Sequence, residues 1–323
     1  MTLSLEDVQS RVPTLSLSLS RVGVTNVEKV IRIGDDLFSA RLDCFVDLGP
    51  RQKGAHMSRF EEVVNDALGE VVLGESALRA ETLAQHIAEK VRDRQGARRA
   101  EVHIEARYPE HKPAPVSGIE TQEIYSLLGA AVASEAGTRR LIGVRAQGMT
   151  ACPCAQTLVE ARSRERLQAD GFTEAEIGRI FEHVPVATHN QRGLGTLHIG
   201  CPEDCETDID AQWLVEIVES SMSSEIYELM KRSDEGAVVE KAHRRPRFVE
   251  DCVREMIRGV VDRLPELCDE AFVSARQENL ETIHQHHVVA ERFGLLGELR
   301  REVETGEHLA HHTSMREWLD AAR

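Results

Sequence analysis

Aromatic residues are scarce in this chain, since Phe, Trp and Tyr make up only 4% of its 323 residues. The core must therefore be filled mainly by aliphatic side chains. Lysine is scarce too, because only six of the 39 basic residues are lysine and the remaining 33 are arginine. Few lysines among many acids indicate a GC-rich genome or a salt-loving host, and composition does not separate the two.

Positive charge is in deficit, with 39 basic against 55 acidic residues and a formal net charge of −16. A nucleic-acid partner requires a basic surface that neutralises phosphates, so we expect no nucleic-acid binding. A triphosphate can still be held by a few basic residues in a local pocket. The 41% of hydrophobic and 29% of charged residues are typical of a globular protein rather than a disordered one.

Long apolar runs are absent, because no window approaches the roughly 18 apolar residues that span a membrane. The N-terminal stretch has early acidic residues and no unbroken apolar segment, so we expect no secretion signal. The seven cysteines are an odd number in a long chain, which argues against a disulfide framework. We therefore expect a cytoplasmic protein that does not bind membranes.

Two halves of similar layout follow from the hydrophobic periodicity. In the first half, strand patterns cover residues 15–19, 28–33, 37–48 and 100–107. Helical patterns cover residues 58–68, where Ser58 and Glu61 suggest a capping box, and residues 76–94. Three prolines and a glycine predict a loop over residues 109–118.

The second half again mixes helices and strands. We expect strands over residues 141–147, 195–200 and 271–277, and helices over 121–135, 208–231 and 248–264. A charged helical pair is expected between residues 156 and 183, broken at Asp170-Gly171, with Thr173 and Glu176 as a capping box. The similar order of the two halves suggests an internal duplication of shape.

The stretch Gly148–Gln156 carries the strongest chemical signal. Cys152 and Cys154 flank Pro153 where a strand pattern gives way to a helical one. The partial positive charge of a helix N-terminus stabilises a thiolate there, which is the form that binds metal or attacks carbon. Burial as small hydrophobic residues is the ordinary alternative for free cysteines.

A structural zinc site is a weaker interpretation of the same cysteines. Cys201 and Cys205 could join Cys152 and Cys154 as a four-thiolate set. Acidic residues separate Cys201 from Cys205, and no second pair has the two-residue spacing of a zinc motif.

Histidines and carboxylates supply further candidate ligands. His189 lies in Thr-His-Asn-Gln-Arg-Gly, and His284, His286 and His287 lie in Ile-His-Gln-His-His. One thiolate with several imidazoles suits a borderline metal such as zinc or ferrous iron. The histidines could instead be solvated polar residues, and a solvated position is the default for Glu235 and Glu250.

Residues 53–59, Lys-Gly-Ala-His-Met-Ser-Arg, resemble a cradle for an anion. They combine a glycine turn, two cations, a hydroxyl group and a helix start, which together suit phosphate. His56 could also be a helix-entry residue without consequence.

Several of these segments together resemble one family, the type IB GTP cyclohydrolases, and within it the archaeal branch called MptA. The resemblance runs from about residue 22 to residue 287 and rests on residues 22–27, 53–59, 115–118, 148–156, 188–193, 227–235, 248–251 and 281–286. The gap between Cys152 and His189 is 189 − 152 = 37 residues, filled by a helical insert as in the archaeal branch. Ser233 stands where the family usually has proline, and the adjacent Glu235 is kept.

The resemblance implies a tunnelling fold, which is an α+β architecture of two tandem modules of antiparallel sheet with helices layered on one face. It implies a first module over residues 1–115, a second over 116–290 that carries the metal ligands, and a helical tail over 291–323. Such modules assemble side by side, so we expect a homodimer or homotetramer with residues of two subunits in each site.

The resemblance also implies the reaction, a metal-dependent opening of the guanine imidazole ring of GTP with release of formate. In the archaeal branch the products are 7,8-dihydroneopterin 2′,3′-cyclic phosphate and pyrophosphate, in the first step of archaeal pterin biosynthesis of the methanopterin or folate type. The implied metal is Fe²⁺, with Mn²⁺ and Zn²⁺ as alternatives.

Residue roles follow motif by motif from the resemblance. The implied metal ligands are Cys152, His189, Glu235 and His284, with His286 as the alternative to His284. Glu250 is implied to anchor the guanine and transfer protons, so that Cys152, His189 and Glu250 form the catalytic set. The four residues implied to face the triphosphate from the neighbouring module are Lys53, His56, Ser58 and Arg59.

Three alternatives stay open. The bacterial-type reaction retains the triphosphate and yields 7,8-dihydroneopterin triphosphate. A nitrile reductase of the same superfamily would form a thioimide on its cysteine and depend on NADPH. A non-catalytic metal- or nucleotide-binding protein of the same fold would bind without turnover.

Overall fold

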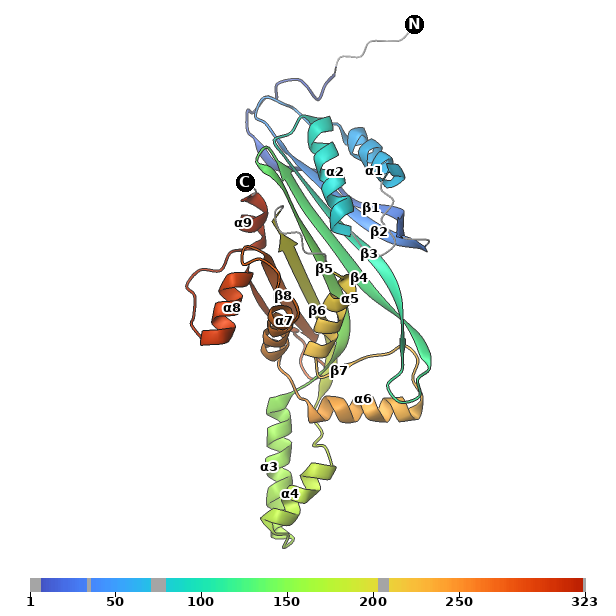
Figure 1. The fold of residues 1–323 in the computed structure, drawn as a ribbon, viewed down its shortest axis with the longest axis vertical. Coiled ribbons are helices and arrows are strands. Elements are labelled where there is room, and N and C mark those ends of the chain that lie inside the picture. The colour runs from blue at the N-terminus through green and yellow to red at the C-terminus, as the bar shows by residue number, and fades with distance from the viewer. Residues whose placement is uncertain (1–6, 34–35, 71–79, 203–208, 322–323) are drawn as a thin grey trace.

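One antiparallel sheet organises the protein (Figure 1). The structure is a computed structural model that describes residues 7–33, 36–70, 80–202 and 209–321. The strands are β1 Leu19–Ile33, β2 Asp36–Leu48, β3 Arg99–Pro113, β4 Glu120–Ser134, β5 Gly137–Ala151, β6 Asn190–Cys201, β7 Ser224–Glu225, β8 Phe272–Leu280 and β9 Val288–Leu295. The helices in these residues are α1 Met57–Glu70, α2 Ala80–Gln95, α3 Pro153–Ala169, α4 Glu174–His183, α5 Ala211–Ser221, α6 Arg232–Arg244, α7 Val249–Arg263, α8 Leu296–Thr305 and α9 Met315–Asp320.

The order of elements repeats along the chain. β1-β2-α1-α2-β3-β4 is followed by β5-β6-α5-α7-β8-β9, while the α3–α4 hairpin lies between β5 and β6 and α6 lies between α5 and α7. The main path of the sheet is β1-β2-β3-β4-β5-β6-β8-β9, and β7 pairs with β5. The α+β class, the antiparallel sheet and the two similar halves predicted from the sequence are therefore confirmed.

The module boundaries stay a prediction. The expected boundary after residue 115 falls in the turn of the β3–β4 hairpin, where Pro113 pairs with Glu120. The boundary after residue 290 falls within β9. The repeat of the element order starts again at residues 135–136, between β4 and β5.

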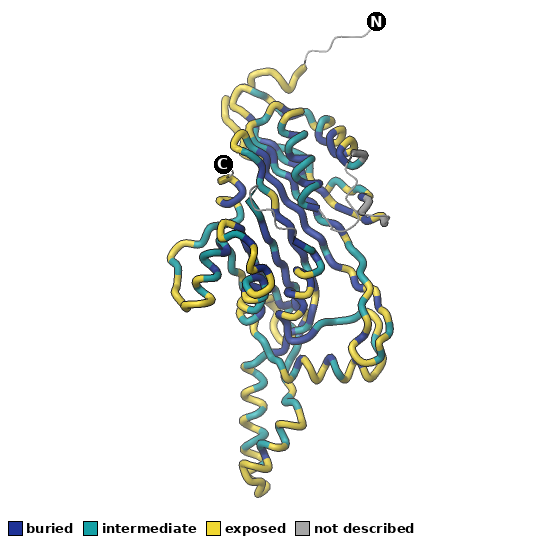
Figure 2. Tube along the Cα trace, viewed as in Figure 1, coloured by how far each residue is buried: buried dark blue, intermediate teal, exposed yellow. Residues whose placement is uncertain are grey.

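Helices cover one face of the sheet. The central strands of the sheet are the most buried part of the described chain (Figure 2). In β3 the buried residues alternate with partly exposed ones, as expected for a strand with one face on the core. The start of α2 lies tightly against β4 at Gly129, where an added Cβ atom would lie 2.4 Å from the backbone carbon of Ala80. Any larger residue there would push α2 away from the sheet.

The C-terminal helix α9 covers part of the other face. Trp318 is 2% exposed and packs with Val132, Leu141 and Phe272 in a second apolar cluster. Its indole nitrogen donates a hydrogen bond to the Glu270 carbonyl oxygen at 3.0 Å. The tail is thus held against the sheet by one large buried side chain.

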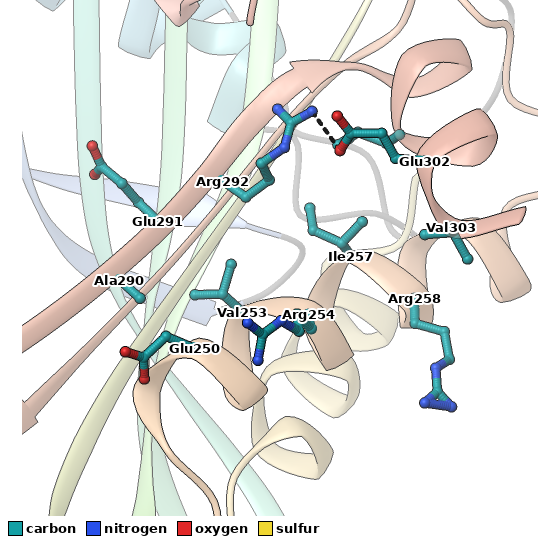
Figure 3. Close-up of a pocket in the computed structure, with 11 residues that line it drawn as sticks. Glu250, Val253, Arg254, Ile257, Arg258, Ala290, Glu291, Arg292, Glu302 and Val303 are labelled. Carbon is teal, nitrogen blue, oxygen red and sulfur yellow. Dashed lines mark hydrogen bonds and ion pairs between the residues drawn. The ribbon is translucent and has the colours of Figure 1, made fainter. Parts of the chain in front are cut away.

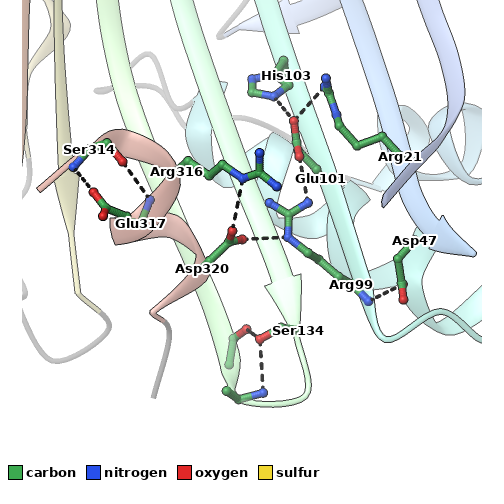
Figure 4. Close-up of polar contacts among 12 residues, drawn as sticks. Arg21, Asp47, Arg99, Glu101, His103, Ser134, Ser314, Arg316, Glu317 and Asp320 are labelled. Carbon is green, nitrogen blue, oxygen red and sulfur yellow. Dashed lines mark hydrogen bonds and ion pairs between the residues drawn. The ribbon is translucent and has the colours of Figure 1, made fainter. Parts of the chain in front are cut away.

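Charged side chains hold α9 to β3 next to this cluster (Figure 4). Arg99 donates to Asp320 at 2.8 Å and to Glu101 at 2.8 Å. Glu101 also accepts from Arg21 at 2.8 Å and lies 2.7 Å from the Nε2 atom of His103. Burial raises the pKa of Glu101, but the hydrogen bonds to His103 and Arg99 and the charges of His103 and Arg21 outweigh it and lower that pKa to about 2.

The helix predicted over residues 121–135 is wrong, because this segment is strand β4. Almost every residue from Leu127 to Ala133 is buried, since α2 covers one face of β4 and α9 the other. A strand buried on both faces loses its alternation and resembles a helical run in sequence.

The helix predicted over residues 208–231 is also wrong in length. Its first residue lies outside the described residues, α5 ends at Ser221, and β7 follows. The hydroxyl groups of Ser220 and Ser221 donate to the carbonyl oxygens of Ile217 and Val218, which competes with continuation of the helix.

Three smaller predictions are wrong. β1 starts at Leu19, and the segment before it is exposed, with Leu15 at 74%. α1 starts at Met57, so Ser58 lies inside the helix and cannot be its cap. β3 extends to Pro113, which leaves only residues 114–119 as the turn of a hairpin.

The remaining segments match the expected types, including the capping box of Thr173 and Glu176 on α4. Residues 76–79 of the expected second helix lie outside the described residues. No pattern predicted α6 or β9. Among the side chains of α6 only Asp234, Val238 and Ala242 are buried, which leaves too thin an apolar stripe to be recognised.

We expect Trp318→Ala to lower the free energy of unfolding by about 3–5 kcal/mol, because it empties a fully buried site. Urea unfolding of the purified variant measures this. Trp213, which is 44% exposed on α5, gives the control: Trp213→Ala should change stability by no more than about 0.5 kcal/mol. Equal losses in both variants would contradict the packing of α9.

Glu101 should make stability depend on pH. Its folded pKa of about 2 lies below the ordinary value of 4.5, so the ionised group stabilises the protein above the unfolded pKa. That contribution disappears as pH falls from about 4.5 towards 2. Glu101→Gln should lower the melting temperature at neutral pH, and its difference from the wild type should shrink as pH falls from about 4.5 towards 2. Glu304→Gln, on the exposed side of α8, should change neither value.

Candidate active site

The pairing of β5 with β6 brings Cys152 and His189 together. Ala151 pairs with Asn190 at the last position of this ladder. Cys152 comes directly after Ala151 and His189 directly before Asn190, so both lie at the same end of the ladder. The Cys152 backbone N–H donates to the His189 carbonyl oxygen at 3.1 Å. The Thr188 hydroxyl donates to the Cys152 carbonyl oxygen at 2.8 Å, which closes the strand ends.

Cys152 is also the N-cap of α3. Its Sγ atom accepts from the Ala155 backbone N–H at 3.5 Å, and Pro153 starts the helix. Cys154, two residues further along the chain in the first turn of α3, is exposed. The strand-to-helix junction predicted from the sequence is thus present, and the two thiols differ in surroundings.

His189 faces two acceptor groups through its Nδ1 atom. The Gln191 side-chain oxygen lies 3.1 Å away, and a carboxylate oxygen of Glu281 lies 3.9 Å away. Glu281 follows directly on β8, and only 7% of its side chain is exposed. No role was predicted for Gln191 or Glu281, although both lie within motifs of the family resemblance. The acidic Glu281, just before the histidine-rich segment, was the one sequence feature that could have pointed to a contact with a histidine.

Glu235 lies on the first turn of α6, where the neighbouring Asp234 fixes the backbone. Asp234 Oδ1 accepts from the Val116 and Ser117 backbone N–H groups, each at 2.8 Å. Asp234 Oδ2 accepts from the Ser117 hydroxyl at 2.7 Å and the Lys231 N–H at 2.8 Å. Burial raises the pKa of Asp234, but these hydrogen bonds hold it well below its usual range. The Glu235 side chain itself is exposed.

His284 and His286 lie in the exposed segment after β8. Their rings stack with centroids 5.0 Å apart. Within the described residues, which include Cys152, His189, Glu235, His284 and His286, no group of three or more His, Cys, Asp or Glu is arranged to hold a metal. One chain therefore does not assemble the predicted set of Cys152, His189, Glu235 and His284.

Cys152 and His189 nevertheless fit a metal in their chemistry. A thiolate and an imidazole are donors that zinc and ferrous iron accept. Both groups lie at adjoining strand ends, and within the described ranges the side-chain contacts of His189 are made through Nδ1, which leaves Nε2 available there. This pair is the part of the predicted metal centre that a single chain brings together.

The four-thiolate zinc site is wrong for a single chain. Cys201 pairs with Arg140 at the far end of the β5–β6 ladder from Cys152. Eleven strand residues separate the two ends, which is a distance of more than about 30 Å. Cys205 lies outside the described residues.

Glu250 lies on the first turn of α7 and lines a cavity of about 500 Å³ between α7, β9 and α8 (Figure 3). Across the cavity Arg292 donates to Glu302 at 2.9 Å. The start of α7 is tied to the Cys152 strand, because the Arg247 N–H donates to the Ala151 carbonyl oxygen at 2.9 Å.

In the predicted phosphate loop, residues 53–56 lie between β2 and α1 and residues 57–59 start α1, which lies far from α3 (Figure 1). The Lys53 N–H donates to the carbonyl oxygens of Gln9 at 3.0 Å and Arg11 at 2.9 Å. The His56 Nε2 atom lies 3.3 Å from an Asp7 carboxylate oxygen. The N-terminal segment thus contacts the Lys53 backbone and the His56 ring, both in the stretch that was predicted to bind phosphate.

The other members of this loop differ in exposure. Lys53 and Ser58 have exposed side chains. Arg59 donates to the Arg94 carbonyl oxygen at 3.3 Å. A single chain does not bring any of them to Cys152, so their role toward the triphosphate stays a prediction.

Comparison with known families decides the assignment. The model of the family described as type I GTP cyclohydrolase folE2 matches residues 5–290. The chain belongs to this family. Membership makes it an enzyme of the GTP cyclohydrolase class and confirms the resemblance found in the sequence motifs.

Curated members of the family are similar over almost their whole length. The GTP cyclohydrolase MptA of Methanococcus aeolicus is 40% identical over 92% of this chain and 99% of its own length. The protein of that name from Methanothermobacter thermautotrophicus is 41% identical over 92% of this chain and 96% of its own length.

Solved structures resemble this GTP cyclohydrolase family member more distantly. A uricase from Bacillus fastidious has 10% identity and a TM-score of 0.47 over 90% of this chain and 99% of its own. The uricase of Arthrobacter globiformis has 9% identity and a TM-score of 0.49 over 90% and 96%. Likeness at this level carries no functional weight.

No helix in the described ranges is long and apolar enough to cross a membrane.

Cys152→Ala should remove metal binding and abolish turnover, whereas Cys154→Ala should keep substantial activity. The reason is that Cys152 adjoins His189, while Cys154 is exposed beyond Pro153. Metal analysis and GTP turnover of the two purified variants measure the difference. Equal metal loss in both variants would contradict the assignment of Cys152, rather than Cys154, as the metal ligand.

Proposed function

We propose that this protein is a metal-dependent GTP cyclohydrolase of the archaeal type. It opens the imidazole ring of GTP, releases formate and pyrophosphate, and forms 7,8-dihydroneopterin 2′,3′-cyclic phosphate as the first step of archaeal pterin biosynthesis. The observation that carries the proposal is the Cys152–His189 pair at adjoining strand ends. Relatives about 40% identical that are named GTP cyclohydrolase MptA support it.

The proposed metal is Fe²⁺, with Mn²⁺ or Zn²⁺ as alternatives. Cys152, His189, Glu235 and His284 or His286 would hold it. When bound, such a cation activates water for attack at neutral pH. The mixed sulfur, nitrogen and oxygen donors suit these borderline metals.

The protein's own groups bind and orient the nucleotide. Glu250 accepts hydrogen bonds from the two adjacent N–H donors on the guanine edge, and its carboxylate takes up and returns protons during ring opening. Its position beside a cavity supports this role, since a purine needs a recess that excludes water. Lys53, His56, Ser58 and Arg59 would face the triphosphate.

Association into a homodimer or homotetramer is part of the proposal. The ligands are not gathered in the described residues of one chain, and α1, which carries part of the phosphate loop, lies far from α3, which starts after Cys152. β1 and β9 are the outer strands of the main sheet path, so each offers an edge for pairing with a second copy. A shared site would explain why a single chain presents only the Cys152–His189 pair.

The deciding experiment incubates the full-length protein with GTP and Fe²⁺ under anaerobic conditions and identifies products by mass spectrometry. We expect formate, pyrophosphate and the cyclic phosphate. Dihydroneopterin triphosphate would assign the bacterial-type reaction, and nucleotide binding without product would overturn the enzymatic proposal. Light scattering in the same buffer tests the oligomer, which a monomeric active enzyme would exclude.

Glu235→Ala and Glu250→Ala should separate metal binding from proton transfer. Glu235→Ala should lose metal, whereas Glu250→Ala should keep near-normal metal and lose about 10²- to 10⁴-fold in rate. Metal analysis beside single-turnover assays measures both quantities. Metal loss in Glu250→Ala with retention in Glu235→Ala would reverse the roles. Full activity in either variant would remove that residue from the site.

A further inference from the structure

A buried chain of polar contacts leads from the core to the imidazole of His189. Gln191 and Thr150 are register partners across the β5–β6 ladder. Gln191 is 5% exposed and Thr150 is completely buried. The Gln191 Nε2 atom donates to the Thr150 hydroxyl oxygen at 3.0 Å, and the Gln191 Oε1 atom lies 3.1 Å from His189 Nδ1.

These contacts determine where the neutral imidazole carries its proton. An amide oxygen can only accept a hydrogen bond, so the ring nitrogen that faces it must be the donor. The Glu281 carboxylate oxygen at 3.9 Å from the same Nδ1 atom favours a proton there as well. Nδ1 therefore carries the hydrogen, and Nε2 keeps the free electron pair that binds a metal.

Glu281 favours one orientation of the amide. If the Gln191 amide turned over, its NH₂ group would face Nδ1 and reverse the tautomer of His189. The Glu281 carboxylate near Nδ1 favours a proton on that nitrogen and hence the amide oxygen facing it, and the Thr150 hydroxyl, which can accept, then takes the NH₂ group. Because Gln191 is almost completely buried, water cannot readily replace either contact.

We propose that Gln191, held by Thr150, is a positioning residue that fixes the Nδ1–H tautomer of His189 and so presents Nε2 to the metal. This inference rests on the proposed function, because it uses His189 as a ligand. It goes further in assigning a role to two residues of the strand ladder that are not among the predicted metal ligands or substrate-binding residues.

The test uses the full-length protein labelled with ¹⁵N-histidine and purified without metal, at a pH where the ring is neutral. Long-range ¹H–¹⁵N correlation spectra report the tautomer, and His189→Gln identifies the His189 signals. We expect Nδ1–H in the wild type and a mixture of tautomers in Gln191→Met. Gln191→Glu should restore the wild-type spectrum, because it keeps an oxygen toward Nδ1.

Metal affinity supplies the second readout. Titration with Co²⁺ alone, followed by absorbance, should show about 10- to 100-fold weaker binding for Gln191→Met and little change for Gln191→Glu. Gln147→Met is the matched control, because Gln147 is an exposed glutamine on β5 that accepts from Arg192 instead. It should change neither tautomer nor affinity.

An Nε2–H tautomer in the wild type would overturn the inference, as would a Gln191→Met variant that keeps both tautomer and Co²⁺ affinity. If circular dichroism shows that Gln191→Met does not fold, Thr150→Val and Thr150→Ser replace it, and only Thr150→Val should disturb the tautomer. GTP turnover enters neither readout. A protein without cyclohydrolase activity would therefore count against the proposed function and not against this inference.

Discussion

The hydrogen-bonded ladder between β5 and β6 is the interaction on which the site depends. The ladder pairs Arg140 with Cys201 at one end and Ala151 with Asn190 at the other, so its register alone sets Cys152 beside His189. The 36 residues between them in the sequence fold out of the way, mostly as the α3–α4 hairpin. A shift of one residue in this register would turn every side chain of β6 to the opposite face. The register that stabilises the sheet therefore also determines the geometry of the site.

Burial on both faces of the central strands explains how such a long ladder keeps its register. The helix layer supplies one apolar face, and α9 supplies the other through Trp318. Two pairs of buried polar residues inside the sheet bind each other, Gln191 with Thr150 and Gln277 with Asn279. Buried polar groups tolerate few alternative arrangements, so these pairs add specificity to the apolar packing.

Two levels of organisation meet at this site. A single chain fixes the thiol, the imidazole and the start of α7 through short backbone contacts. The exposed Glu235 and His284 and the distant loop of Lys53 are left apart. Exposed candidate ligands on an incomplete centre, together with outer strands β1 and β9 that each pair on one edge only within the described residues, are what a site divided between copies of a chain would present.

The sequence by itself determined the α+β class, the duplicated layout, most strands and helices, and the chemical motifs, because these depend on local periodicity and on residue types at fixed spacing. It misjudged β4, since a strand covered on both faces loses its alternation, and it missed α6 and β9, whose apolar stripes are thin. It also could not show that Gln191 and Glu281 face His189. Only the tertiary structure decided those contacts, because they join ends of strands that lie far apart along the chain.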